Sequence, residues 1–237
     1  WARDVGAVGG DLTIDGASLR WTGEAAPGDV PWDASGVDIV LECTGRFRTP
    51  EALAPYFERG VRKVVVAAPV KHDSALNVVM GVNDDIYDAG KHAVVSAGSC
   101  TTNCLAPIAK VMLDSFGIES GLMMTVHAYT NDQHILDVPH RKGDLRRARA
   151  AAISMIPSST GAAKALSEVI PALKGKFDGQ AVRVPTVDVS LVDLTLNTTR
   201  AVTKDTIHAA MRKAADEGPM KNILDFTDVE LVSNDYI

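Results

Sequence analysis

The stretch of sequence that decides the fold is SAGSCTTNC, residues 96–104. An apolar run over residues 92–96 precedes the turn, and a helical pattern over residues 101–115 follows it and ends near Gly117. The stretch therefore predicts a strand that turns sharply into a helix, with Cys100 in the first helical turn. Unpaired amide groups and the positive end of the helix dipole lie there, and both favour a thiolate.

Upstream of this turn, the sequence predicts short buried strands at residues 37–41, 63–68 and 76–81. Thr49-Pro50-Glu51 is typical of a helix start, and Gly60 is expected to end that helix. Continuous β-branched runs separated by a helix favour a parallel sheet that is covered on both faces. We therefore expect residues 1–98 to form the C-terminal part of a doubly wound, Rossmann-type α/β domain.

Downstream, longer strands are predicted at residues 122–129, 180–184 and 187–196. In the last of these, apolar Val187 and Val189 alternate with polar residues, which indicates a strand with two unlike faces. Helices are predicted at residues 161–170 and 204–217, with Thr203 capping the second. We expect residues 99–237 to form an α+β catalytic domain with a mixed, largely antiparallel sheet.

Composition narrows the function classes. The 237 residues carry a net charge of −6, an acidic balance that argues against a nucleic-acid partner. No run approaches the roughly 18 apolar residues that a membrane span needs. Cys43, Cys100 and Cys104 are too few for a disulfide framework and favour a reducing, cytoplasmic compartment. A zinc site is not expected because no second Cys/His pair follows, so we interpret Cys43 and Cys104 as structural.

A nucleophilic thiolate needs a base or an imidazolium partner, and His127 is the best candidate among six histidines. It lies inside the predicted strand at residues 122–129. Taken alone, a histidine there is more often a packed core residue. The run Thr130-Asn131-Asp132-Gln133 favours the functional interpretation, because it places hydroxyl and amide groups at the end of the strand.

Cationic side chains are concentrated in one segment of this acidic chain, namely Arg141, Lys142, Arg146, Arg147 and Arg149. A solvated charged loop is the default interpretation. The alternative is phosphate capture, for which the guanidinium fork of donors is well suited. The turn at residues 158–161, SSTG, precedes a predicted helix and offers hydroxyls and amides to an anion, while Arg183 lies between two strands. Together these features suggest chemistry on a phosphorylated substrate.

Several motifs occur in a fixed order: SCTTNCLAP at 99–107, HAYTNDQ at 127–133, DLRRARA at 144–150, STGAAK at 159–164 and RVPT at 183–186. With LECTG at 41–45 and Ala68-Pro69, they resemble the phosphorylating glyceraldehyde-3-phosphate dehydrogenase family over essentially the whole chain. The resemblance implies an NAD-dependent oxidoreductase of glycolysis, which oxidises glyceraldehyde 3-phosphate with inorganic phosphate to 1,3-bisphosphoglycerate.

The resemblance also implies roles for individual residues. Cys100 would be the nucleophile that carries a thioester, and His127 would pair with its thiolate and move protons. Arginines 147 and 183 can serve both phosphate pockets in this family. The substrate phosphate would lie among Thr130, Asp132 and Arg183, and the attacking phosphate among Ser99, Thr101, Arg147, Thr160 and Gly161. The expected cofactor contacts are Thr44, Gly45, Ala67 and Pro139.

Further expectations rest on the same resemblance. Val138-Pro139 favours NAD over NADP, and the loop at residues 133–146 implies a subunit interface in a homotetramer. Residues 141–143 make this loop slightly longer than the bacterial pattern. No Gly-x-Gly-x-x-Gly fingerprint occurs, so we expect a partial chain that lacks both termini and carries an incomplete NAD-binding domain. Ala97-Gly98 replaces the Asn-Ala usual in the family.

Two groups of alternatives stay open at this point. An erythrose-4-phosphate dehydrogenase or an arsenate-linked dehydrogenase of the same family would share most of these motifs. A thiol hydrolase or acyltransferase would use the same Cys–His pair without a nicotinamide. A binding protein that has lost catalysis is disfavoured because Cys100 and His127 are both present.

Overall fold

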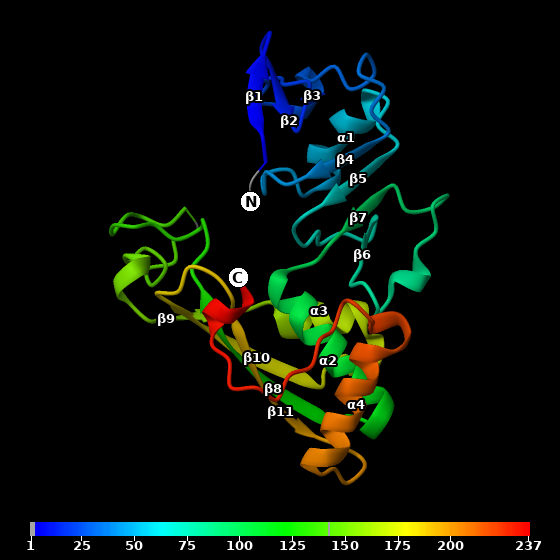
Figure 1. Ribbon diagram of the computed structural model, residues 1–237, viewed down its shortest axis with the longest axis vertical. Coiled ribbons are helices and arrows are strands. Elements are labelled where there is room, and N and C mark those ends of the chain that lie inside the picture. Colours follow the sequence, from blue (N-terminus) through cyan, green and yellow to red (C-terminus); the bar gives the residue numbers. More distant parts are fainter. Residues whose placement is uncertain (1–2, 142) are drawn as a thin grey trace.

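The computed structural model describes residues 3–141 and 143–237 and arranges them around three sheets (Figure 1). Lys142, part of the predicted basic segment and of the longer loop, lies outside the described residues, as does Trp1. A small antiparallel sheet and a four-stranded parallel sheet form one end of the molecule. A four-stranded mixed sheet, accompanied by helices, forms the other end. This is the α/β architecture with a parallel and a mixed sheet that the sequence predicts.

The parallel sheet has the strand order β4-β5-β7-β6, with all neighbours parallel. Helix α1 starts where predicted, because the Thr49 side chain accepts a hydrogen bond from the Ala52 amide at 3.3 Å. Leu53 and Tyr56 of this helix pack against the valines of the sheet. The bounds are Ile39–Glu42 for β4, Pro50–Glu58 for α1, Lys63–Val66 for β5, Ala75–Asn77 for β6 and Val94–Ser96 for β7.

The expectation that this sheet is covered on both faces is wrong for β4. Successive side chains of a strand point to opposite faces, and burial alternates along β4 accordingly. Val40 and Glu42 are buried on the face that α1 covers, whereas Ile39 and Leu41 are 57% and 69% exposed. Within the described residues, the other face of β4 is therefore open.

Residues 5–19 form three short antiparallel strands that the sequence patterns did not reveal, namely β1 (Val5–Val8), β2 (Asp11–Ile14) and β3 (Ala17–Leu19). Their two connections are tight turns, in which Gly9, Gly10, Asp15 and Gly16 all adopt positive φ. Turns with positive φ at both central residues match the twist of a hairpin and favour glycine and aspartate.

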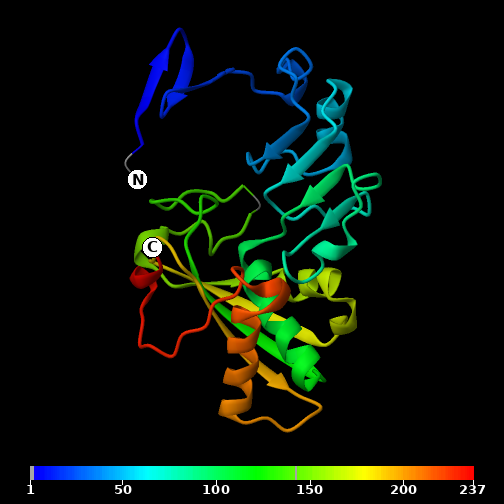
Figure 2. The ribbon, with the colours of Figure 1, turned by 45° about the vertical axis from the view of Figure 1, so that its right-hand side comes forward.

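The mixed sheet has the order β11-β8-β10-β9, and only β8 and β10 run parallel. Helix α2 contacts both α3 and α4, and its Leu105 and Ala109 share one core with Met123 and Leu166 (Figures 1 and 2). The bounds are Cys100–Phe116 for α2, Ser120–Ala128 for β8, Ile156–Ser159 for β9, Ala162–Val169 for α3, Phe177–Val184 for β10, Leu191–Asn197 for β11 and Lys204–Asp216 for α4.

The helix predictions in this half are confirmed, but one strand prediction is too long. Thr203 caps α4 as predicted, and Thr206 completes a capping box. Strand β11 begins at Leu191 and not at Val187. The alternation at residues 187–190 belongs to a loop, in which Val189 adopts a φ of 62° and its amide donates to the Asp188 carboxylate at 2.8 Å.

Short 3₁₀ helices complete the fold. They span Pro27–Asp29, Asp84–Ile86, Ala151–Ile153, Pro171–Leu173, Gly218–Met220 and Ser233–Tyr236. Across the part of the chain that the structure describes, no helix combines the length and the apolar character needed to cross a bilayer.

Candidate active site

The turn from β7 into α2 fixes the position of Cys100. Gly98 adopts a φ of 68°, a conformation that glycine takes without strain, and its amide donates to Ser96 Oγ at 3.1 Å. Ser99 is the N-cap, since its Oγ accepts from the Thr102 amide at 3.1 Å. Cys100 is consequently the first residue of the helix, as predicted, while the Ser99 hydroxyl is engaged in holding the helix start.

Cys100 and His127 lie within hydrogen-bonding distance, with 3.3 Å between Sγ and Nε2. This hydrogen bond is the main reason that the pKa of the Cys100 thiol is lowered to about 7, with help from the imidazole charge and against the effect of burial. The thiol therefore ionises close to neutral pH, well below the ordinary range of a cysteine. The pair places an accessible, partly ionised sulfur next to a group that can exchange protons with it.

Neighbouring groups fix the orientation of the His127 ring. The residue is only 6% exposed, and Nδ1 lies 2.6 Å from the Ala128 carbonyl oxygen. Arg183 Nη1 is 3.1 Å from the same nitrogen, but its two hydrogens have acceptors at Ala128 O, 2.9 Å away, and Thr130 Oγ1, 3.0 Å away. A guanidinium cannot accept a hydrogen bond, so the proton on Nδ1 is donated to the Ala128 carbonyl oxygen. Nε2 then faces the sulfur of Cys100.

Strand register explains why Arg183 meets His127. The two residues are directly paired across β10 and β8, although 56 residues separate them in sequence. Beyond Arg183, Thr130 donates to Asp132 Oδ1 at 2.5 Å, and Arg147 pairs with Asp132 Oδ2. Arg147 also donates from Nε to Ser158 Oγ at 2.8 Å, which ties it to β9. Arg183, Thr130, Asp132 and Arg147 thus form one continuous network.

The charge state of Asp132 follows from its partners. Burial raises the pKa of its carboxyl group, but the Thr130 hydrogen bond and the positive charges of Arg147 and Arg183 outweigh this effect and leave the pKa below its usual value. Arg183 is affected in the opposite direction, since burial lowers its pKa and Arg147 adds repulsion. Asp132 is therefore a carboxylate that lies between two guanidinium groups.

A pocket of about 310 Å³ opens beside the Cys–His pair. Of the predicted site residues, it brings together Cys100, Thr101, His127 and Thr130. The loop before β11 supplies a wall that sequence reasoning missed, because residues 187–190 were assigned to a strand; Pro185 was the available signal of a break. The other lining residues are Cys104, Thr125, Ala128, Tyr129, Val187, Asp188, Val189, Ser190 and Val192.

Thr160 and Gly161 stand at the junction of β9 and α3. Thr160 Oγ1 accepts from the Ala162 amide at 3.2 Å, and Gly161 is the residue that precedes the helix. Neither lines the pocket beside Cys100. Both follow Ser158, the hydroxyl that binds Arg147, so Arg147 and the start of α3 border the same end of β9.

The predicted cofactor residues Thr44, Gly45 and Ala67 follow the carboxyl ends of β4 and β5. The register pairs Glu42 with Val66 and Val66 with Ser96, so β4, β5 and β7 end at one common edge. Thr44, Gly45 and Ala67 are all exposed there, and the chain continues from β7 directly to Cys100. Ligands of open parallel sheets bind at such an edge. Pro139 is exposed in the loop between β8 and β9.

Comparison with known proteins gives a consistent result. Residues 99–237 match the family described as "Glyceraldehyde 3-phosphate dehydrogenase, C-terminal domain". The chain is 50% identical over 236 residues to glyceraldehyde-3-phosphate dehydrogenase 3 of Nostoc sp. (strain PCC 7120), covering 100% of this chain and 69% of that protein. Identity is 52% over 224 residues to the enzyme of Streptomyces coelicolor, covering 94% and 66%. It is 51% over 233 residues to that of Geobacillus stearothermophilus, covering 98% and 68%.

The chain belongs to the glyceraldehyde-3-phosphate dehydrogenase family. The prediction made from its motifs is thereby confirmed, and the chain spans about two thirds of the length of these relatives.

Two cysteines of this glyceraldehyde-3-phosphate dehydrogenase family member remain to be placed. Cys43 does not have the buried position expected for the end of a buried strand; β4 ends at Glu42, and Cys43 is exposed beyond it. Cys104 follows Cys100 by one helical turn and lines the same pocket. Burial and the nearby Cys100 charge raise the pKa of the Cys104 thiol, so it stays protonated where Cys100 ionises.

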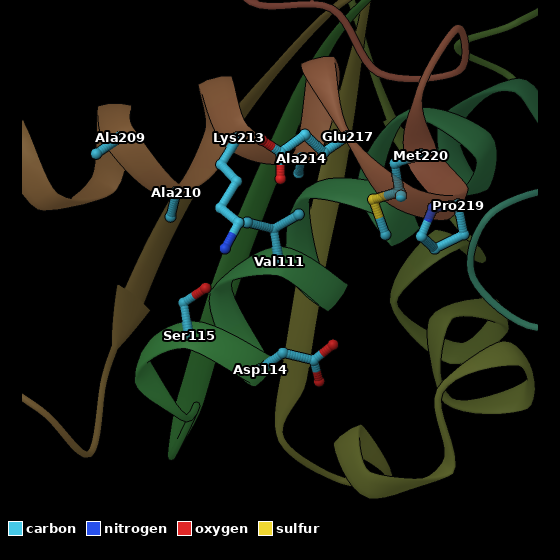
Figure 3. Close-up of a pocket in the computed structure, with 11 residues that line it drawn as sticks. Val111, Asp114, Ser115, Ala209, Ala210, Lys213, Ala214, Glu217, Pro219 and Met220 are labelled. Carbon is cyan, nitrogen blue, oxygen red and sulfur yellow. The ribbon is translucent and has the colours of Figure 1, made fainter.

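A cavity larger than the one beside Cys100 lies elsewhere, between α2 and α4 (Figure 3). Its volume is about 570 Å³, and Val111, Ala214 and Met220 provide apolar walls beside Lys213 and Glu217. It contains none of the motif residues of the glyceraldehyde-3-phosphate dehydrogenase family singled out above, and no cysteine or histidine lines it. Size alone therefore does not identify the reactive site in this molecule.

Proposed function

We propose that this protein is an NAD-dependent phosphorylating dehydrogenase that converts glyceraldehyde 3-phosphate and inorganic phosphate to 1,3-bisphosphoglycerate. The observation that carries the proposal is the 3.3 Å contact between Cys100 Sγ and His127 Nε2 beside Arg183, in a chain whose relatives bear the name of this enzyme. We assign residues 1–98 to the cofactor domain and residues 99–237 to the catalytic domain, an assignment supported by the family match over the second range.

Cys100 is the nucleophile that forms the covalent intermediates. Its thiolate attacks the aldehyde carbon, the carbonyl double bond opens, and the oxygen takes a proton from His127 Nε2 to give a thiohemiacetal. His127 then removes this proton again as the carbon loses its hydride, which leaves a thioester on Cys100. An oxygen of inorganic phosphate attacks the thioester carbon, the thiolate departs, and the acyl phosphate is released. Throughout, the Ala128 carbonyl holds the ring of His127 in one orientation.

NAD supplies the hydride acceptor when it is bound. The common edge of β4, β5 and β7 fits such a ligand, because a Cβ added at Gly45 would meet no atom within 4 Å and the neighbouring Thr44 and Ala67 are exposed. Thr44, Gly45 and Ala67 would hold the cofactor there, with Pro139 from the loop of residues 133–146. We assign NAD and not NADP on the Val138-Pro139 pair.

Two anion sites follow from the arginine network. Arg183 and Thr130 bind the phosphate of the substrate, supported by their contact with each other and with the strand that carries His127. Arg147, with Thr160 and Gly161 at the start of α3, binds the attacking phosphate, together with Ser99 and Thr101 at the start of α2. Asp132 belongs to the substrate-phosphate site, and it contacts both Thr130 of that site and Arg147 of the site for the attacking phosphate.

The assembly and compartment are part of the same proposal. We assign a homotetramer whose subunits meet through the loop of residues 133–146, which is supported by the exposure of Ile135 (82%), Leu136 (72%) and Leu145 (83%). Large apolar side chains exposed together are typical of interaction surfaces. The three unpaired cysteines support a reducing, cytoplasmic location.

Acylation by an acyl phosphate tests the thioester without requiring NAD. Acetyl phosphate should acylate Cys100 by the reverse of the final step, and inorganic phosphate should then remove the acetyl group. Mass spectrometry of the intact protein and of its peptides measures both events. The matched variant Cys100→Ser should show no adduct, because an alcohol of ordinary pKa is a far weaker nucleophile at pH 7. An unchanged adduct in this variant would refute the mechanism.

Steady-state rates separate the alternatives. Turnover of glyceraldehyde 3-phosphate should require NAD and produce NADH, and it should exceed turnover of erythrose 4-phosphate. Faster turnover of erythrose 4-phosphate, or a preference for arsenate over phosphate, would assign the neighbouring activities of the family. Product formation without NADH absorbance would favour a thiol hydrolase or acyltransferase.

A further inference from the structure

Asp132 is an unusual residue to find among phosphate-binding groups, because its negative charge repels phosphate. It is nevertheless well held in this position. Oδ1 accepts from the Thr130 hydroxyl at 2.5 Å, and Oδ2 pairs with the Arg147 guanidinium. The side chains of Arg147 and Asp132 are only 20% and 22% exposed, so the pair is largely shielded from solvent.

Its partners are the groups that the proposed function assigns to phosphate. Thr130 belongs to the substrate-phosphate site, and Arg147 belongs to the site of the attacking phosphate. A phosphate oxygen would need the same hydroxyl and the same guanidinium donors, and a carboxylate satisfies them with the same chemistry. Asp132 therefore occupies donors that phosphate must use.

The same residue also keeps the empty site together. Arg147 and Arg183 repel each other, whereas Asp132 attracts both. Without this carboxylate, Arg147 would keep only its longer pair with Asp144, at 3.6 Å, as a counter-ion against the charge of Arg183. Asp132 thus stabilises the arginines when phosphate is absent and competes for them when phosphate arrives.

We propose that the Asp132 carboxylate is a built-in competitor of phosphate, which phosphate displaces from Arg147 and Thr130 when it binds. The inference rests on the proposed function, since that function assigns these two residues to phosphate. It adds that Asp132 weakens phosphate binding. The apparent affinity of the site for phosphate is the intrinsic affinity multiplied by the fraction of molecules in which Arg147 is free of Asp132. A phosphate that leaves easily suits a site that must release an acyl phosphate in every turnover.

The test compares inorganic phosphate binding in the wild-type chain and in Asp132→Asn. Asparagine keeps the size of the side chain and removes its charge. The half-saturating phosphate concentration, measured from the rise of Tm with phosphate, should fall about tenfold. Without phosphate, the variant should have a lower Tm than the wild type because Arg147 has lost its closer counter-ion and keeps only Asp144. The KM for phosphate in removal of the acetyl group from Cys100 should fall in parallel.

Two further variants control for charge and for the carboxylate itself. Asp114→Asn changes the net charge equally but breaks only the exposed pair with Lys110 on α2, so its phosphate affinity should equal that of the wild type. Asp132→Glu keeps a carboxylate and should also bind phosphate weakly. If Asp132→Asn fails to fold, Asp132→Ser makes the same comparison with a smaller side chain that still accepts from Thr130.

Failure can be assigned to its source. Phosphate affinity that is unchanged or weaker in Asp132→Asn, while the wild type binds phosphate, overturns the competitor role and leaves the proposed function standing. Equal tightening in Asp132→Asn and Asp132→Glu also overturns it, because charge would then not be the cause. A wild-type protein that phosphate does not stabilise at any concentration counts against the phosphate sites of the proposed function itself.

Discussion

The edge of the parallel sheet and the end of the mixed sheet each hold a carboxylate, but the two carboxylates have different partners. Glu42 is 2% exposed and accepts from neutral donors only: the Thr44 amide at 2.8 Å, the Thr44 hydroxyl and the Tyr56 hydroxyl. Asp132 is partly exposed and pairs with the cationic Arg147. The first carboxylate holds the backbone of the Thr44-Gly45 turn, whereas the second lies among side chains that we propose bind phosphate.

This difference shows that one carboxylate holds the backbone in position, whereas the other competes with ligands for a cationic partner. Among the described residues, the hydrogen-bond donors to Glu42 are neutral, so an anion that replaced this carboxylate would gain no cationic partner. A carboxylate on an arginine can be replaced, because the arginine gains an equivalent partner. The parallel-sheet edge therefore presents backbone and small residues to a ligand, and the mixed-sheet site presents charges.

The largest change in kinetics is expected from substitution of Arg183, the cationic residue that contacts His127 and Thr130 in the mixed-sheet site. In Arg183→Lys the fork that joins Ala128 O and Thr130 Oγ1 is lost, and an ammonium does not reproduce its geometry. The KM for glyceraldehyde 3-phosphate should rise about a hundredfold, as expected for the loss of charge-assisted hydrogen bonds worth ~2–3 kcal/mol. Unphosphorylated glyceraldehyde is the control, and its kinetics should change little. Equal losses for both substrates would mean that Arg183 acts through His127 instead.

A smaller effect is expected at His127, which lowers the pKa of the neighbouring thiol. In His127→Asn this cause is removed, so the pKa of Cys100 should rise from about 7 toward its ordinary value of roughly 8.5. The thiolate fraction at pH 7 should fall about fifteenfold and should recover as the pH rises above the new pKa. Alkylation of Cys100 by iodoacetamide, mapped by peptide mass and measured across pH, reports this shift. An unchanged midpoint would show that the helix start alone activates the thiol.

The smallest effect is expected at the parallel-sheet edge. Tyr56→Phe removes the donor to Glu42 Oε2 and leaves a buried carboxylate oxygen unpaired. The free energy of unfolding in urea should fall by ~1–3 kcal/mol. The pH profile of Cys100 alkylation should not change, because Tyr56 belongs to the other region. Tyr87→Phe is the matched control, since Tyr87 is 39% exposed and should tolerate the change. A shifted alkylation profile in Tyr56→Phe would show that the two regions are not separate.

Sequence patterns predicted what is local. The place of Cys100 in the first turn of α2, the helix start at Thr49-Pro50-Glu51 and the cap at Thr203 depend on contacts within a few residues, and all three are confirmed. The alternation at residues 187–190 led to the prediction of a strand that does not form there. Hydrophobic periodicity carries no information about backbone dihedral angles, and Val189 adopts a positive φ. Gly9-Gly10 and Asp15-Gly16 carried a local hairpin signal for residues 5–19 that the patterns considered did not use.

Within the site, the chemistry of the residues was predictable but their pairing was not. The motifs indicated Cys100, His127 and the arginines as types of group in a given order. The ion pair between Arg147 and Asp132 joins residues 15 apart through an irregular loop, and no periodicity encodes such a contact. The meeting of His127 with Arg183 depends on the register of β8 and β10, which the sequence alone leaves free.

The turn between β7 and α2 makes the reactive thiol depend on the parallel sheet. Ala97 donates to the Val66 carbonyl at 2.9 Å, and Cys100 follows only three residues later. When β7 separates from β5, this anchor and the start of α2 are released together, and the sulfur leaves His127 even if the mixed sheet stays folded. The geometry of the reactive pair therefore depends on both sheets, and opening of the parallel sheet alone is enough to separate the sulfur from the imidazole.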